Sequence, residues 1–460
     1  MNIQVTSEKV GDGKIQAKVV VAAADVDAAI KKTYSDIATN YRFQGFRKGR
    51  VPRPVIDGMI GRKNVLGETT NQLMQQVEPL LFDELDVVPI SEPNYGEGEL
   101  PTVVEGEDYV LDATITVRPD ATLSTYEAPT INMPPAEPTE AEIDEQIDVL
   151  QGYHTTYDEI EEDRAVEAAD VVSVNGENVE NAERFAGENR MLDLAGTGMP
   201  AAFDEQLVGL TKGETRDLEW TDGEGDAAVT RKAKVTLNSI RKANTPELTD
   251  EFVKKSYGFD TIAELREAVS EELAQDKAYT LPNVKENRLV DAVAATLELE
   301  EIPEEYVNNV YTDLVQNFLT QLQNQGTTLD SYLQVRGITA EAFLDDLRQQ
   351  AQERARQSLA LDALADHLEL KVEHEDLVKE FTDANMDAES SIEEFRNDGR
   401  LPAVREAIRR SKALEWLVAN CKINEVDEIA ERRAARAAEA PAEEPAAEPE
   451  AASEEPANEE

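Results

Sequence analysis

The sequence predicts a multidomain α+β protein, in which an α+β domain, an antiparallel β domain, an extended all-α domain and a disordered acidic tail follow one another. Three observations predict this order. A chain of 460 residues is longer than a single hydrophobic core usually organises. Residue patterns change along it from mixed, to valine-rich with glycine clusters, to almost wholly helical. The last 24 residues, 437–460, contain nine Glu, nine Ala and four Pro but no Lys or Arg.

Residues 1–122 combine strand and helix patterns. Polar and apolar residues alternate at the start of 14–21, and a second strand pattern covers 109–117 before Pro119. Helical spacing recurs between these strands, in Val26, Ile30, Tyr34 and Ile37 and again through 65–81. We therefore expect a small α+β domain over residues 1–122.

Residues 123–160 have the composition of a linker with its own helix. Prolines at 134, 135 and 138 mark a connector. Thr139 and Glu142 then form a capping-box pattern ahead of apolar residues at helical spacing. The pattern predicts a helix that ends near Tyr153.

The remaining boundaries follow changes of pattern. Valine-rich runs, glycine clusters and charged turns alternate over 161–245, as is typical of a small antiparallel β domain. Helical patterns fill 246–432 and are punctuated by Pro282, Pro303, Gly326, Gly337 and Gly399. Their apolar residues form no continuous seam, which favours an extended arrangement. The acidic composition of 433–460 predicts a disordered tail, because its charges repel and it has little apolar area to bury.

Composition excludes several classes of function. No apolar run approaches the roughly 18 residues that span a bilayer. A lone cysteine, Cys421, and residues 1–6 without a basic, apolar leader favour the cytoplasm. The three histidines, His154, His367 and His374, lack metal-ligand spacing, and no nucleotide-binding or nucleophile motif occurs. We therefore expect no metal and no cofactor. Rotation about an X–Pro bond is a reaction that needs neither of these and no nucleophile.

One basic segment contradicts the overall charge. The formal net charge is −51, yet residues 37–56 contain no Asp or Glu. The same window contains five cations, Arg42, Arg47, Lys48, Arg50 and Arg53. Glycines on both sides of Phe46 permit a tight turn that presents an aromatic ring and cations to a polyanion. The alternative is an ordinary surface turn, which the charge contrast disfavours.

The run Gly45-Phe46-Arg47-Lys48-Gly49-Arg50-Val51-Pro52 closely resembles the ribosome-docking signature of the bacterial trigger factor family. The order of the domains and the segment 246–252 are similar to that family as well, over residues 1 to about 430. The resemblance implies an ATP-independent chaperone that shields nascent polypeptides at the ribosomal tunnel exit. Its implied partners are rRNA, a tunnel-exit ribosomal protein and unfolded chains. Family members tend to self-associate off the ribosome, but no sequence pattern here shows a homodimer surface.

The middle domain resembles the FKBP-type prolyl isomerases with several departures. Val174 stands where the family has an aromatic residue, and the turn at 196–203 is one residue shorter than the family's. The tyrosine of the family's later motif is absent from 220–226. The resemblance implies a shallow apolar pocket and weak isomerase activity, or a purely structural role. The expected pocket residues are Met191, Leu194, Phe203 and Leu207.

Unfolded segments are expected to bind dispersed apolar residues of the helical domain. The candidates are Tyr306, Val307, Val310, Tyr311, Phe318, Leu319, Leu322, Tyr332 and Leu333. Packing between helices is the better explanation for at least half of them. Two other functions stay open at this point: a free prolyl isomerase, which predicts a complete aromatic pocket, and an assembly chaperone that does not contact the ribosome.

Overall fold

The computed structural model describes residues 1–439 except 2, 12, 97–99, 161–163, 169, 183–184, 195–198, 223–228, 300 and 337. Two compact units emerge from the contacts. One comprises residues 1–133 with 282–424, and the other comprises 134–281 with the chain from 425 onward. This division cuts through the predicted helical domain, because helical periodicity does not specify which partner a helix packs against.

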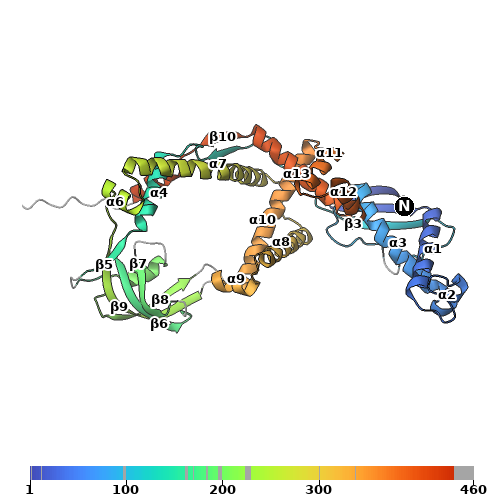
Figure 1. The fold of residues 1–460 in the computed structure, drawn as a ribbon, viewed down its shortest axis with the longest axis horizontal. Coiled ribbons are helices and arrows are strands. Elements are labelled where there is room, and N and C mark those ends of the chain that lie inside the picture. The colour runs from blue at the N-terminus through green and yellow to red at the C-terminus, as the bar shows by residue number, and fades with distance from the viewer. Residues whose placement is uncertain are drawn as a thin grey trace, which may run out of the picture. The chain divides into compact units, whose positions relative to one another are not determined.

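The N-terminal region is a three-stranded antiparallel sheet covered by helices (Figure 1). The strands are β1 (Ile3–Gly11), β2 (Lys14–Val21) and β3 (Tyr109–Thr116), in the order β1-β2-β3. The helices are α1 (Ala23–Asn40), α2 (Arg53–Ile60) and α3 (Arg62–Leu85). Both predicted strands and both predicted helices of this region are confirmed. β1 is an edge strand with mostly exposed residues, so its pattern carries little signal.

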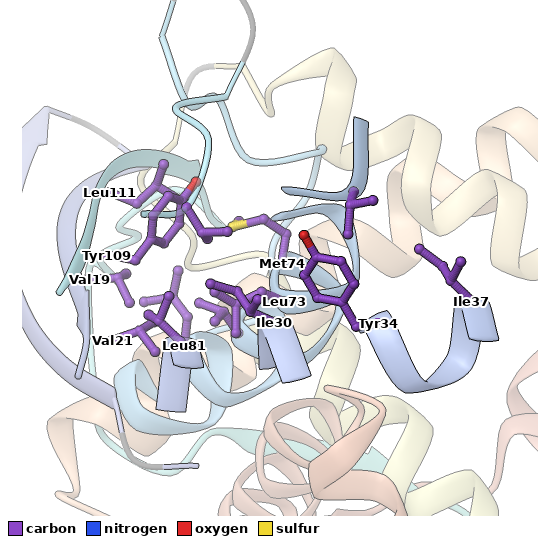
Figure 2. Close-up of a cluster of buried hydrophobic side chains, with 14 of the residues drawn as sticks. Val19, Val21, Ile30, Tyr34, Ile37, Leu73, Met74, Leu81, Tyr109 and Leu111 are labelled. Atoms are coloured by element: carbon purple, nitrogen blue, oxygen red, sulfur yellow. The ribbon is translucent and has the colours of Figure 1, made fainter. Parts of the chain in front are cut away.

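Side chains from the sheet and from α1 and α3 meet in one core (Figure 2). The strands contribute Val19, Val21, Tyr109 and Leu111, and the helices contribute Ile30, Tyr34, Ile37, Leu73, Met74 and Leu81. Alternate residues of β3 are buried, as a strand with one face on a core requires. This core fixes the ends of α1 and α2, between which the basic segment lies.

The same unit contains most of the C-terminal helices. They are α8 (Glu304–Asn324), α9 (Leu329–Arg336), α10 (Ala340–His367), α11 (His374–Asp383), α12 (Ala388–Asn397) and α13 (Leu401–Asn420). β4 (Thr130–Met133) pairs with β10 (Lys422–Glu425). The helical character that the sequence predicts for this region is confirmed.

Ion pairs join the N-terminal region to these helices in two places. At the first, Arg405 lies 2.8 Å from Asp83 and 3.1 Å from Asp86, and Arg409 lies 2.7 Å from Asp86. Asp86 closes α3 with a left-handed φ of 51°. A non-glycine residue in that conformation is uncommon, and here its side chain binds two guanidinium groups.

The second place is a largely buried group of charged residues around Asp362, which we call the Asp362 cluster. It comprises Arg118, Asp362, Glu406 and Arg410. Asp362 on α10 is 2% exposed and accepts two hydrogen bonds from Arg410, at 2.7 and 2.8 Å. Arg118, which follows β3, lies 3.6 Å from Asp362 and 3.4 Å from Glu406. These acidic neighbours raise the pKa of both guanidinium groups against the effect of burial. Both guanidinium groups therefore keep their charge, and their contacts with Asp362 and Glu406 hold the end of β3, α10 and α13 together.

The second unit begins with the linker helix α4 (Glu140–Gly152), which Thr139 and Glu142 cap as predicted. A five-stranded sheet follows, in the order β5-β9-β6-β7 with β8 on β9. Its members are β5 (Thr156–Glu159), β6 (Val171–Glu180), β7 (Gly187–Asp193), β8 (Thr215–Asp222) and β9 (Val229–Asn244). The short helices α5 (Ala201–Leu207) and α6 (Asp250–Ser256) come before and after β8 and β9 in the chain.

Two boundaries differ from the sequence prediction. Pro282 lies inside the continuous helix α7 (Ile262–Ala294), so it does not separate two helices there. The predicted tail starts at 433, but α14 (Glu428–Glu439) continues to Glu439 because Arg432 and Arg433 pair with carboxylates of α4. Residues 440–460 lie outside the described part of the chain. Within the described part, no helix is long and apolar enough to cross a membrane.

Candidate functional site

The basic segment forms an exposed loop, residues 41–52, between α1 and α2. Its end is tied back to α1, since the Gly49 N–H donates to the Ala38 carbonyl at 2.8 Å. The Arg50 N–H donates to the Arg47 carbonyl at 3.0 Å and closes a turn. The loop therefore has a defined conformation without any partner present. We call residues 41–52 the docking loop.

Both glycines of the docking loop have backbone conformations that favour glycine. Gly45 has a φ of 82° and Gly49 a φ of 73°. A side chain in the left-handed region costs about 1 kcal/mol. The tight turn that the sequence predicts at these two positions is confirmed.

The two phenylalanines of the docking loop differ in burial: one anchors the loop in the core and the other is exposed. Phe43 is 4% exposed and belongs to the N-terminal core, whereas Phe46 is 42% exposed. The Phe46 N–H donates to the Phe43 carbonyl at 3.3 Å, so the anchor holds the presented ring. Phe43 does not stand out in the sequence, because spacing alone does not show which of two nearby aromatic residues points inward.

Four cations of the docking loop have no acidic partner among the residues that the structure describes. Arg42, Arg47, Lys48 and Arg50 are exposed, and none forms an ion pair with a described residue. Arg53 differs, since its guanidinium lies 3.0 Å from Glu105 and stacks 4.8 Å from the centre of the Tyr34 ring. Of the five cations that the sequence analysis groups together, four are therefore available to a polyanion.

Tyr34 anchors α2 beneath the loop. Its hydroxyl donates to the Asp57 carboxylate at 2.5 Å. Burial raises the pKa of Tyr34 to about 12, and the hydrogen bond to Asp57 adds to the rise. The hydroxyl therefore keeps its proton at neutral pH and fixes α2 against α1.

The predicted isomerase pocket is occupied by packing. Phe203 and Leu207 are fully buried and Leu194 is 7% exposed, all in one core cluster. The Phe203 ring centre lies 5.1 Å from that of Phe185 and 4.9 Å from that of Trp220. This aromatic triad fills the space beside Phe203. In this conformation neither Phe203 nor Leu207 is exposed to a substrate.

Met191 is not part of that cluster. It is 43% exposed on β7, away from the residues with which the sequence analysis groups it. Phe185 is the residue that the sequence analysis misses. Its ring packs so closely on Gly176 that a Cβ there would lie 2.6 Å from it. The turn at 196–198 and the segment 223–226 lie outside the described residues.

The predicted client-binding residues separate into three groups. Val307, Leu322 and Leu333 are buried, so packing between helices explains them. Only Leu319, at 39%, is exposed. The others are half-buried in two small cores between α8, α9 and α10: Tyr306, Val310, Tyr311, Phe318 and Tyr332.

Tyr306 and Val310 also line a cavity of about 500 Å³ between α8, α10, α13 and residues 88–90. Burial raises the pKa of Tyr306 to about 12, so its hydroxyl is neutral. Three exposed apolar residues near the turn between α9 and α10 are missing from the sequence prediction. They are Val335 at 88%, Ile338 at 41% and Leu344 at 43% exposed. A short apolar stretch gives no sign of whether its residues are buried or exposed.

Comparison with known proteins matches both ends of the chain to one family. Residues 3–150 match the family described as bacterial trigger factor protein (TF), and residues 261–419 match the bacterial trigger factor protein (TF) C-terminus. The chain belongs to the bacterial trigger factor family. It is therefore a ribosome-associated chaperone, as the basic signature and the order of the domains imply.

Individual relatives agree over nearly the whole length. The trigger factor of Staphylococcus carnosus (strain TM300) is 29% identical over 426 residues, which cover 90% of this chain and 96% of the relative. That of Halothermothrix orenii is 27% identical over 429 residues, covering 90% and 99%. A solved structure described as "Promiscuous Substrate Recognition in Folding and Assembly Activities of the Trigger Factor Chaperone" shares 20% identity over 90% of this chain and 99% of its own. Its TM-score of 0.36 is too low to compare arrangements.

Proposed function

We propose that this chaperone docks at the ribosomal tunnel exit through its docking loop, residues 41–52, with Phe46, Arg47 and Lys48 as the central contacts. The observation that carries the proposal is the state of the loop cations. The chain has 96 acidic and 45 basic residues, yet residues 37–56 contain no Asp or Glu. The docking loop keeps four of them together beside a half-exposed aromatic ring.

The chemistry of the loop suits a surface made of rRNA and protein. Arg47, Lys48 and Arg50 supply charge-assisted hydrogen bonds to phosphate oxygens and to carboxylates of a tunnel-exit ribosomal protein. Phe46 supplies an apolar anchor of the kind that dominates small interfaces. Gly45, Gly49 and Pro52 shape the backbone on either side. Because the loop is preformed, little ordering entropy opposes binding.

Co-sedimentation with ribosomes tests the docking proposal. The triple change of Phe46, Arg47 and Lys48 to Ala removes one anchor and two cations, and we expect about a 100-fold loss of affinity. The control changes Lys31 and Lys32 to Ala, two exposed lysines of α1 without an ion pair among the described residues. It alters the net charge equally and should bind nearly as well as the parent. Undiminished binding of the triple variant at moderate salt would refute docking through this loop and favour an assembly chaperone off the ribosome.

Unfolded clients are proposed to bind the apolar surface near the α9–α10 turn, without ATP. Several weak apolar contacts allow both capture and release, because each contributes little. Changing Val335 and Leu344 to Ser should reduce the suppression of aggregation of an unfolded protein, with the fold unchanged. Leu322→Ala is the contrasting variant: since Leu322 is 4% exposed, it should destabilise α8. If the double Ser variant protects the client as well as the parent does, this surface is not the binding site.

The β domain is proposed to be a weak peptidyl-prolyl isomerase in which the aromatic triad limits access to Phe203. A peptide assay should show a rate close to that of the uncatalysed isomerisation. Rapid isomerisation that Phe203→Ala abolishes, with the sheet intact, would instead favour a free prolyl isomerase. Met191→Ala should change nothing, since that side chain lies outside the triad.

Two further expectations rest on family membership. The protein works in the cytoplasm, where its ribosomal partner is, and it forms a homodimer when it is not bound. Cell fractionation tests the first and sedimentation of the free protein over a range of concentrations tests the second.

A further inference from the structure

A second group of cations lies beside the docking loop, at the other end of α2. Arg62 and Lys63 open α3 and are exposed, next to Met59, which is 67% exposed. Arg62 lies 3.2 Å from Glu105, and Arg53, which follows the docking loop, lies 3.0 Å from the other oxygen of the same carboxylate. One carboxylate thus holds an arginine from each end of α2, and the two guanidinium groups are neighbours.

The turn that carries Glu105 is fixed on both sides. Val103 is fully buried, and its N–H donates to the Thr70 hydroxyl at 3.1 Å. The Gly106 N–H donates to Asp27 at 2.8 Å, and Gly106 adopts a φ of 82°. Glu105 is therefore held in place over the arginines by its own backbone.

These two ion pairs contribute little to folding. The side chains of Arg53, Arg62 and Glu105 are 42%, 62% and 46% exposed. Exposed pairs of this kind are weak, because water and salt screen them. A polyphosphate with several oxygens competes well for such guanidinium groups, since a phosphate accepts two parallel hydrogen bonds from arginine.

We propose that Arg53, Arg62 and Lys63 form a second contact with the phosphate backbone of ribosomal RNA, and that Glu105 covers the two arginines until RNA replaces it. The proposal rests on docking through residues 41–52. It extends the RNA-facing surface along α2, an eight-residue helix about 12 Å long. Because Glu105 must be displaced, it lowers the affinity for an RNA whose phosphates do not reach both the docking loop and the group of Arg53, Arg62 and Lys63.

Ribosome affinity measured over a salt series tests the second contact. Changing Arg62 and Lys63 to Gln removes two phosphate contacts, so the plot of log affinity against log salt should become shallower by about 1.8. A slope equal to that of the parent overturns the proposal. The triple Ala variant of Phe46, Arg47 and Lys48 separates the two claims. If it abolishes binding while the Arg62 and Lys63 change leaves the slope unaltered, docking holds and the second contact fails.

Glu105→Gln tests the covering role. It frees both arginines and should tighten ribosome binding by about 3- to 10-fold at low salt, with a smaller gain as salt rises because salt screens exposed pairs. Glu107→Gln is the matched control, because Glu107 lies in the same turn, changes the net charge equally and pairs with no described cation. Equal effects of the two changes overturn the covering role, as does weaker binding with Glu105→Gln. In a variant that carries Arg53→Gln and Arg62→Gln, the advantage of Glu105→Gln over Glu107→Gln should disappear.

Discussion

Arginines occupy opposite environments in the docking loop and in the Asp362 cluster. Arg47 and Arg50 are exposed and have no ion pair among the described residues, whereas Arg118 and Arg410 are largely buried and surrounded by carboxylates. The chain has about two acidic residues for each basic one, so the difference lies in where the fold places the carboxylates. The contrast shows that a cation becomes a candidate for function where the fold withholds acidic partners from it, and becomes structural where the fold supplies them.

The largest expected effect comes from removing a paired arginine from the Asp362 cluster. Arg410→Met removes both short hydrogen bonds to Asp362 and leaves a buried carboxylate with only Arg118, 3.6 Å away. We expect a loss of about 3 kcal/mol in the local stability of α10 and α13, because an underpaired buried charge is costly. Hydrogen exchange of these helices measures it. Arg354→Met, an exposed residue of α10, is the control, and an equal effect there would contradict the buried-charge explanation.

The second largest effect concerns salt, to which the exposed and the buried arginines should respond differently. Four free cations in contact with phosphate predict that ribosome affinity falls roughly 100-fold between 50 and 200 mM salt. Exchange protection of α10 and α13 should stay nearly constant over that range, because buried pairs are screened little. Binding that does not depend on salt would mean that Phe46, rather than the cations, supplies most of the affinity.

Backbone shape should matter less than charge. Gly49→Ala places a side chain at a φ of 73°, which costs about 1 kcal/mol in the docking conformation. Ribosome affinity should fall about 5-fold with no change in overall stability. Gly58→Ala serves as the control, since Gly58 lies in α2 with open space around the position of its Cβ. If both substitutions leave binding unchanged, the loop conformation is not selected for docking.

The smallest expected effect concerns Glu406 in the Asp362 cluster. Burial raises the pKa of Glu406, and the negative charge of Asp362 adds to the rise. When folding raises the pKa of a carboxyl, its protonated form stabilises the fold at pH values below the pKa of the unfolded state. That contribution is lost as the pH rises through the pKa of the folded state. Glu406→Gln should therefore raise stability at pH 7 by less than about 1 kcal/mol and give no gain at pH 4. Thermal unfolding at the two pH values measures this, and a clear loss at pH 7 would show that the ionised form is needed.

Local patterns predict much of this fold and of the docking loop. The capping box at Thr139 and Glu142, the alternation in 109–116 and the glycines around Phe46 each act through a few adjacent residues. Pro282 is the exception, since α7 continues through a residue that usually ends a helix. Burial is a related limit, because apolar character does not show that Met191 is exposed and Leu322 is buried.

Motifs, periodicity and charge are properties of neighbouring residues, so they suffice to identify the family, most of the element types and a basic, glycine-bounded loop. Only the tertiary structure decided which cations are free. Arg53 and Arg47 look alike in the sequence, but residues 103–106 are brought over Arg53 and place Glu105 within 3.0 Å of it. Pairing depends on residues about 50 positions apart in the chain, and that separation is closed only by the packing of the core.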